Sequence, residues 1–295
     1  MTLTDRLRAH LLALIGTRDP VTSPDALRSA EDYLTGQFQR LGLDVSFHPF
    51  QALGKTYRNV IAAMPASPRT APQDDTRPLI VAAHYDTVPG SPGADDNASG
   101  LAVMLEVARS LRAVPLGRSL RFIGFCLEER EQLGSLAYAS SLREAGQDIL
   151  GAIVLECVGY ACSEEGSQFA PAAVPIAIPS TGDFLGIIGN TASAELAGAV
   201  ERAMNRHVPD LRTVSLLVPG QGERLPDTRR SDHAAFWAHG YPALMLTDTA
   251  NFRNPHYHQA SDTLATLDLA FLRQVAEAVT AAALDLAGTD MRPGA

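Results

Sequence analysis

Apolar and polar residues follow one another along the chain in a pattern that predicts alternating strands and helices. Unbroken apolar runs at 79–83 and 152–155 are typical of strands that are buried on both faces. We expect further strands at 43–50, 57–64, 119–126, 213–218 and 243–247. Apolar residues at helical spacing predict helices at 24–41, 101–111, 133–145, 192–207, 231–237 and 269–286. This alternation indicates an α/β fold, a three-layer α/β/α sandwich around a mixed central β-sheet.

Capping residues and glycines predict where several elements begin and end. The run Ser-Pro-Asp at Ser23 is typical of a helix start, and Gly42 is expected to end that helix. Gly54 separates two predicted strands, which favours a hairpin. Asp268 is the expected cap of the last helix. Charged residues interrupt the apolar positions of 1–19, so we interpret this segment as a helix and not as a signal peptide.

Two irregular stretches, 161–190 and 219–230, are rich in loop-forming or polar residues and show little periodicity. We interpret both as loops, and we expect them to carry the residues that line a substrate pocket. The chain shows no internal repeat and no linker between two cores. The simplest organisation is a single domain over 1–295, with N-terminal helices in 1–42 and a catalytic core at about 43–288.

Composition excludes several classes of partner. The chain has 295 residues, of which 46% are hydrophobic, and its net charge is −9. It carries no lysine- or arginine-rich block, so nucleic acid and anionic membrane surfaces are poor partners. No apolar stretch is long enough to span a bilayer. Three cysteines form neither a disulfide framework nor a CxxC zinc pattern, and we expect a cytoplasmic protein.

Side chains that bind metals gather where predicted strands end and where one helix begins. Because ligands collect at the carboxyl ends of strands in an open α/β sheet, we expect these side chains to lie close together. Imidazole and carboxylate without thiolate suit zinc in a catalytic site, and a pair of ions would share one carboxylate. The candidates are His84, the pair Asp95-Asp96, the pair Glu128-Glu129, Glu156 and the segment 254–258, which contains His256 and His258.

Asp86, Tyr257 and one of the two adjacent glutamates have predicted supporting roles. Asp86 lies two residues after His84, so its carboxylate is expected to accept the second imidazole N–H. On an extended backbone Glu128 and Glu129 would point to opposite sides, leaving one to bind metal and one to carry protons. The hydroxyl of Tyr257 could donate to a developing oxyanion.

The order of these motifs resembles metallopeptidase family 28. This family contains co-catalytic di-zinc aminopeptidases together with glutamate carboxypeptidase-like enzymes and glutaminyl cyclases, and the resemblance covers roughly 20–285. It implies a zinc-dependent exopeptidase or phosphorylase/hydrolase-like fold. The motifs are His-x-Asp at 84–86, Asp-Asn-x-Ser-Gly at 96–100, Glu-Glu at 128–129 followed by Gly-Ser, Glu156, Ser-Asp-His at 231–233 and Tyr-His-x-x-x-Asp at 257–262.

The resemblance implies a role for each candidate. Its motif order favours Asp96 over Asp95 and His258 over His256. One departure stands after the two glutamates, where family members often have glycine and this chain reads Arg-Glu-Gln at 130–132. The implied roles are Asp96 as the carboxylate that bridges two zinc ions, His84 and Glu156 as ligands of one ion, Glu129 and His258 as ligands of the other, Glu128 as general base and Tyr257 as oxyanion donor.

The expected function is therefore that of a zinc-dependent aminopeptidase, with two Zn²⁺ and with peptides that have a free N-terminus as substrates. Rival interpretations are a glutaminyl cyclase-type acyl transferase, a related deacylase or carboxypeptidase, and a non-catalytic metal-binding relative. Arg230 and Asp232 are candidate substrate-binding residues; the alternatives are a solvated loop residue and a helix cap.

Overall fold

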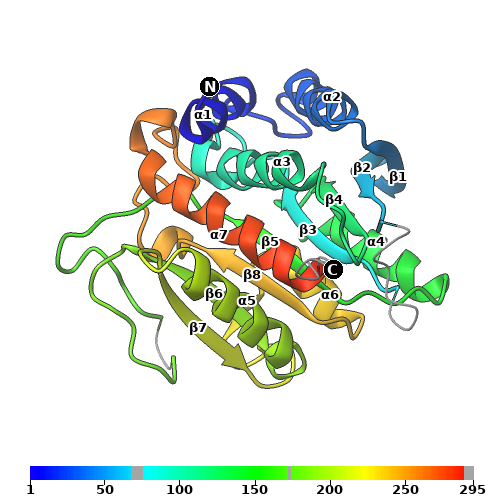
Figure 1. Ribbon diagram of the computed structural model, residues 1–295. Coiled ribbons are helices and arrows are strands. Elements are labelled where there is room, and N and C mark those ends of the chain that lie inside the picture. The colour runs from blue at the N-terminus through cyan, green and yellow to red at the C-terminus, as the bar shows by residue number, and fades with distance from the viewer. Residues whose placement is uncertain (68–75, 172–173, 289–295) are drawn as a thin grey trace.

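A mixed sheet of eight strands runs through the computed structural model, which describes residues 1–67, 76–171 and 174–288 (Figure 1). The strand order across the sheet is β1-β2-β4-β3-β5-β8-β6-β7. The strands are β1 (Asp44–Ala52), β2 (Lys55–Met64), β3 (Leu79–His84), β4 (Leu120–Phe125), β5 (Gly151–Glu156), β6 (Phe184–Asn190), β7 (Arg212–Val218) and β8 (Ala243–Thr247).

The strand directions determine where chemistry can gather. β1 and β2 form the predicted hairpin, and β2 pairs antiparallel with β4. β3 lies between β4 and β5 and is parallel to both, and β8 is parallel to β5. β6 pairs antiparallel with β8 and parallel with β7. The carboxyl ends of β3, β4, β5 and β8 therefore meet at one edge of the sheet, as the sequence predicts for a ligand site.

Helices cover both faces of the sheet, which confirms the three-layer architecture (Figure 1). Alternate side chains of β3 enter two separate cores, with Leu79 and Val81 in one and Ile80 and Ala82 in the other. No helix in the described ranges is both long and apolar enough to cross a lipid bilayer. One layer contains α1 (Leu3–Leu14), α2 (Pro24–Arg40), α3 (Gly100–Leu111), α5 (Ala194–His207) and α7 (Leu269–Ala287), and the other α4 (Leu133–Glu144) and α6 (His233–Ala238).

The predicted helix ends are correct in most places. Ser23 precedes α2, and the carboxylate of Asp268 accepts hydrogen bonds from two backbone N–H groups in the first turn of α7. The helix predicted over 1–19 was wrong beyond Leu14. Gly16, at φ +151°, leaves the helical conformation, and Pro20 follows before the next helix.

The loop predicted over 161–190 was wrong in its last seven residues, because these form β6. β6 contains Gly186 and Gly189, which interrupt the apolar pattern that would otherwise signal a strand. A Cβ at Gly186 would lie 3.2 Å from the carbonyl oxygen of Thr247 on β8, so the strand passes close to its neighbour there. Tertiary packing between β7 and β8 outweighs the weak local signal.

Candidate metal centre

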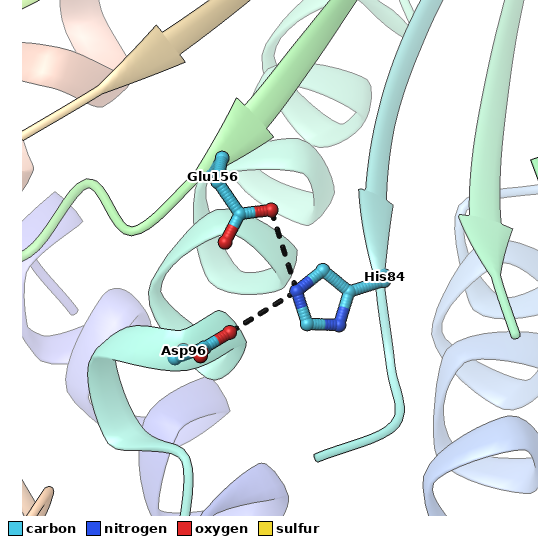
Figure 2. A group of neighbouring side chains, drawn as sticks. All are labelled: His84, Asp96 and Glu156. Carbon is cyan, nitrogen blue, oxygen red and sulfur yellow. Dashed lines mark ion pairs between the residues drawn. The ribbon is translucent and has the colours of Figure 1, made fainter. Parts of the chain in front are cut away.

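Three predicted ligands converge at the ends of β3 and β5 and in the turn that precedes α3 (Figure 2). His84 is the last residue of β3, and its Nε2 lies 3.1 Å from Oδ1 of Asp96. The same nitrogen lies 3.4 Å from Oε2 of Glu156, the last residue of β5. All three side chains are buried. They form one group that could hold a metal ion.

A second group shares Asp96 with the first. Its Oδ2 lies 3.0 Å from Nε2 of His258, and that nitrogen lies 3.2 Å from Oε2 of Glu129. Asp96 therefore directs one oxygen toward His84 and the other toward His258. A carboxylate placed in this way can bridge two ions. Because both groups contain Asp96, the five predicted ligands lie together. We call His84, Asp96, Glu129, Glu156 and His258 the metal centre.

The chemistry of the metal centre fits zinc. Among the residues that the structure describes, four buried atoms of the centre have no hydrogen-bond partner: Nε2 of His84, Oδ1 of Asp96, Oε1 of Glu129 and Nε2 of His258. Within each group the ligand atoms lie within 4.8 Å of one another. Nitrogen and carboxylate oxygen donors are those that catalytic zinc sites use. Unpaired buried polar atoms are costly, so a pair of zinc ions would satisfy them.

The electrostatics of the metal centre favour positive charge. Burial alone would lower the pKa of His258, but the carboxylates of Asp96 and Glu129 outweigh it and raise that pKa to about 10. The centre therefore attracts a cation, and a metal ion would displace the proton from the imidazole.

Asp95 and His256, which the motif order of the family does not favour as ligands, make other contacts. Asp95 accepts a hydrogen bond from the backbone N–H of Gly159 at 2.8 Å and another from Nδ2 of Asn254 at 2.7 Å. Nδ1 of His256 lies 2.9 Å from the hydroxyl of Ser261, and neither residue belongs to the two ligand groups. The choice of Asp96 and His258 agrees with this placement.

The two glutamates lie in a turn, and the extended backbone predicted for them was wrong. Leu127, at φ +64°, redirects the chain directly after β4, and Glu131 and Gln132 also have positive φ. Each such residue costs about 1–2 kcal/mol, so neighbouring contacts must hold the turn. Glu128 is only 8% exposed beside Glu129, and burial raises its pKa well above the usual range.

Asp86 holds this turn in place. Its carboxylate accepts hydrogen bonds from the backbone N–H groups of Glu128 at 3.0 Å and Glu129 at 3.2 Å. The sequence predicted instead that this carboxylate accepts from His84. The nearer acceptor for Nδ1 of His84 is the backbone carbonyl of Asp86 at 3.1 Å, whereas the carboxylate lies 3.7 Å away. The strand ends at His84, so the alternation assumed for Asp86 does not continue.

Two supporting residues received no predicted role. Asp262 accepts hydrogen bonds from the backbone N–H groups of Asp95 at 2.9 Å and Asp96 at 3.2 Å. Its position at the end of the Tyr-His-x-x-x-Asp motif was the available signal. The hydroxyl of Ser231 donates to Oε2 of Glu156 at 2.7 Å. Asp262 fixes the backbone of Asp96 and Ser231 fixes the carboxylate of Glu156, and both contacts raise the precision of the centre.

An apolar pocket adjoins the metal centre, with Glu156 and Tyr257 among its lining residues. The faces of β6, β7 and β8 contribute Ile188, Leu216 and Met245. The predicted loops contribute as well. The apolar pocket is defined by Phe169, Val174, Ile178, Phe184, Gly186, Ile188, Val214, Leu216, Leu225, Met245 and Phe252.

The remaining candidates lie in different environments. Tyr257 stacks on the ring of His258 at 3.8 Å, and its hydroxyl accepts a hydrogen bond from Nη2 of Arg230 at 3.2 Å. Arg230 also lines the apolar pocket. Asp232 is fully buried and is not among the lining residues. Burial, opposed by the charge of His84, raises the pKa of Asp232 to about 7.

Comparison with known proteins places this geometry in a family. The model of peptidase family M28 matches residues 59–283. YfbL of Escherichia coli K12, an uncharacterized protein, is 32% identical over 269 residues, which cover 86% of this chain and 79% of YfbL. The solved zinc aminopeptidase BSAP of Bacillus subtilis is 27% identical with a TM-score of 0.60, and the match covers 82% of this chain but only 53% of BSAP.

More distant solved structures share the fold. The LapA aminopeptidase of Legionella pneumophila superposes with a TM-score of 0.72 at 19% identity, over 96% of this chain and 72% of LapA. Glutaminyl cyclases are also among the similar structures. The family match covers most of the chain and includes every residue of the metal centre. The chain therefore belongs to peptidase family M28.

Proposed function

We propose that this protein is a zinc aminopeptidase that removes apolar residues from the free N-terminus of peptides. The observation that carries this proposal is that the metal centre and the apolar pocket adjoin each other. Glu156 is a ligand of the metal centre and also lines the apolar pocket, as does Tyr257. A scissile bond at the centre would therefore place the neighbouring side chain of the substrate in the apolar pocket.

The proposed chemistry assigns one task to each residue. Two zinc ions held by the metal centre would lower the pKa of a water molecule and polarise the scissile carbonyl. Glu128 is buried beside the centre without belonging to either ligand group. Bound cations would lower its raised pKa, so that its carboxylate could take the proton of the attacking water. It would then pass that proton to the leaving amine. The hydroxyl of Tyr257 would donate a hydrogen bond to the developing oxyanion.

The lining of the apolar pocket supports apolar first residues. Most of its walls are aliphatic and aromatic, although Arg224, Asp227 and Arg230 also line it, so an apolar side chain would bury its surface there against the face of the sheet. The carboxylates around the centre would attract the protonated α-amine, which supports cleavage at a free N-terminus. A neighbour such as BSAP, called a zinc aminopeptidase, agrees with this proposal.

Mass spectrometry of a mixed peptide library tests the proposal. The library is incubated with the zinc-loaded protein, with and without a chelator, and in unblocked and N-acetylated forms. We expect stepwise loss of apolar N-terminal residues that stops with chelator and is absent for acetylated peptides. Loss of ammonia from N-terminal Gln alone would indicate a cyclase. An unchanged library would contradict an aminopeptidase and favour a silent relative.

A further inference from the structure

The connection between α1 and α2, residues 15–23, carries two buried charged side chains that the proposed chemistry does not use. Arg18 is 2% exposed, and Asp19 is fully buried. Both lie before residue 59, where the match to the family model begins. Burying a guanidinium or a carboxylate is costly unless it is well hydrogen-bonded, so the partners of these side chains indicate their role.

Arg18 ties the two ends of one loop together. Its Nε donates to the carbonyl oxygen of Tyr85 at 2.9 Å. Its Nη1 and Nη2 donate to the carbonyl oxygens of Pro92 at 3.1 Å and Gly93 at 3.2 Å. The backbone N–H of Arg18 also donates to the hydroxyl of Thr87 at 2.8 Å. The planar guanidinium thus fixes the start of the loop 85–93 through one hydrogen bond and its end through two.

The loop 85–93 connects two residues of the metal centre. Tyr85 directly follows His84, and Gly93 stands three residues before Asp96. The fit at the second end is close, because a Cβ on Gly93 would lie 2.9 Å from Nη2 of Arg18. The distance from His84 to Asp96 therefore depends on a loop whose two ends Arg18 holds.

Asp19 contacts the residue that follows Glu129, another ligand of the metal centre. Its Oδ1 accepts hydrogen bonds from the backbone N–H groups of Val21 at 2.9 Å and Thr22 at 2.6 Å, which fix the carboxylate. Its Oδ2 accepts from Nη2 of Arg130 at 2.8 Å. Arg130 directly follows the ligand Glu129. The turn with the two glutamates is thus anchored to the N-terminal connection.

This anchor coincides with the departure from the family pattern. Where family members often have glycine, this chain has Arg130 followed by Glu131 at φ +62° and Gln132 at φ +56°. Glycine adopts such conformations easily, whereas other residues need support from their surroundings. The ion pair between Arg130 and Asp19 supplies support of this kind.

We propose that Arg18 and Asp19 are positioning residues of the metal centre, acting from outside the part of the chain that matches the family. Arg18 sets His84 relative to Asp96, and Asp19, through Arg130, sets Glu129. The proposal rests on the metal centre and not on the aminopeptidase activity. Metal binding measured without substrate therefore tests it even if the peptide library is left uncut.

An alternative role for Arg18 is to supply charge alone. Burial lowers its pKa to about 10, opposed by the charges of Asp96 and Asp86, so the guanidinium remains positive near neutral pH. A lysine would retain this charge but could not span carbonyl oxygens at both ends of the loop. The variants R18K and R18M separate the two roles.

The experiment titrates the full-length metal-free protein with Zn²⁺ by calorimetry and with Co²⁺ by visible absorption. We expect R18M and R18K each to weaken both binding events by 10- to 100-fold, the range typical of residues that orient metal ligands. Both events should change because Asp96 belongs to both ligand groups. If R18K binds both ions as tightly as the parent protein, the bridging role is refuted and Arg18 contributes only its charge.

The variants D19N and R130M test the contact between Asp19 and Arg130. We expect each to weaken only the binding event at Glu129 and His258, and the double variant to be no weaker than either single one. Arg130 is partly exposed, so R130M should fold even if R18M does not. Unchanged affinities in folded D19N and R130M would refute the role of Asp19, and unchanged affinities in folded R18M or R18K would refute that of Arg18.

A matched control lies on the same N-terminal part of the chain. Arg6 on α1 pairs with the buried Glu106 of α3 at 2.9 Å, away from the metal centre. R6M should lower the melting temperature while both metal affinities and the Co²⁺ spectrum stay as in the parent protein. If R6M weakened metal binding as much as R18M does, the effect of Arg18 would be general destabilisation and the proposal would fail.

Discussion

The metal centre and the apolar pocket meet at Glu156 but are built in opposite ways. The centre draws its ligands from the ends of β3 and β5, from the turn after β4 and from the loops around α3 and His258. The apolar pocket uses the flat faces of β6, β7 and β8 and two irregular loops. The metal centre thus depends on residue types at the ends of strands and in loops, whereas the apolar pocket depends on apolar side chains that pack across a sheet face.

The largest expected effect separates catalysis from metal binding. Replacing Glu128 by Gln preserves its size but removes the group that takes the proton, so kcat should fall by about 10²- to 10⁴-fold. Metal content, measured by atomic emission, should be unchanged, because Glu128 belongs to neither ligand group. Glu131→Gln, at an exposed position in the same turn, is the control and should retain full activity. Ordinary turnover in Glu128→Gln would show that the base is another residue.

A smaller effect is expected at the border between the two regions. Tyr257→Phe removes one hydroxyl and keeps the ring that stacks on His258. Losing one oxyanion donor costs about 100-fold in kcat, and KM should change little because the contact forms in the transition state. Steady-state kinetics on a dipeptide amide measure both constants. A rise in KM at constant kcat would instead make Tyr257 a substrate-binding residue.

The grouping of the five candidate ligands was predictable from the sequence because its signals are local. His84, Glu128 and Glu156 each follow a recognisable apolar run, and strands that run parallel bring their ends together. Motif order then distinguished Asp96 from Asp95. The sequence could not show the turn at Leu127, because a positive φ at a non-glycine residue leaves no mark in the sequence. That turn explains why the carboxylate of Asp86 accepts hydrogen bonds from backbone N–H groups and lies 3.7 Å from the imidazole of His84.

The apolar pocket was predictable only in part. Its loops were recognised as irregular, but β6 was missed because glycines interrupt its apolar residues. Gly186 lets β6 pass close to β8, because a Cβ there would lie 3.2 Å from the carbonyl oxygen of Thr247 in the lining of the pocket. Long-range contacts such as that between Arg18 and Gly93 also cannot be predicted, because neither local sequence indicates which distant residue it contacts.

Adding a side chain at Gly186 tests the apolar pocket without changing a residue of the metal centre. Gly186→Ala adds one methyl group to the lining, where its Cβ would lie 3.4 Å from Cγ2 and 3.2 Å from the carbonyl oxygen of Thr247. We expect kcat/KM for peptides that begin with Leu or Phe to fall about tenfold relative to peptides that begin with Ala. Leu217→Ala, at an exposed position of β7 outside the lining, is the control. Equal losses for all peptides would place the substrate side chain elsewhere.

An effect of similar size, on metal affinity at one site alone, is expected where the two regions meet. Ser231 stands at the end of the pocket loop and donates to Oε2 of Glu156 at 2.7 Å, so Ser231→Ala removes one support from a shared residue. We expect metal affinity to fall about tenfold at the site of His84 and Glu156 and to stay constant at that of Glu129 and His258, because Asp96 keeps its own supports. Calorimetric titration with Zn²⁺ resolves the two events, and the Leu-to-Ala preference is measured in parallel. A changed Leu-to-Ala preference at constant metal affinity would mean that Glu156 acts in the apolar pocket more than in the metal centre. The boundary between the two regions would then lie at Asp96.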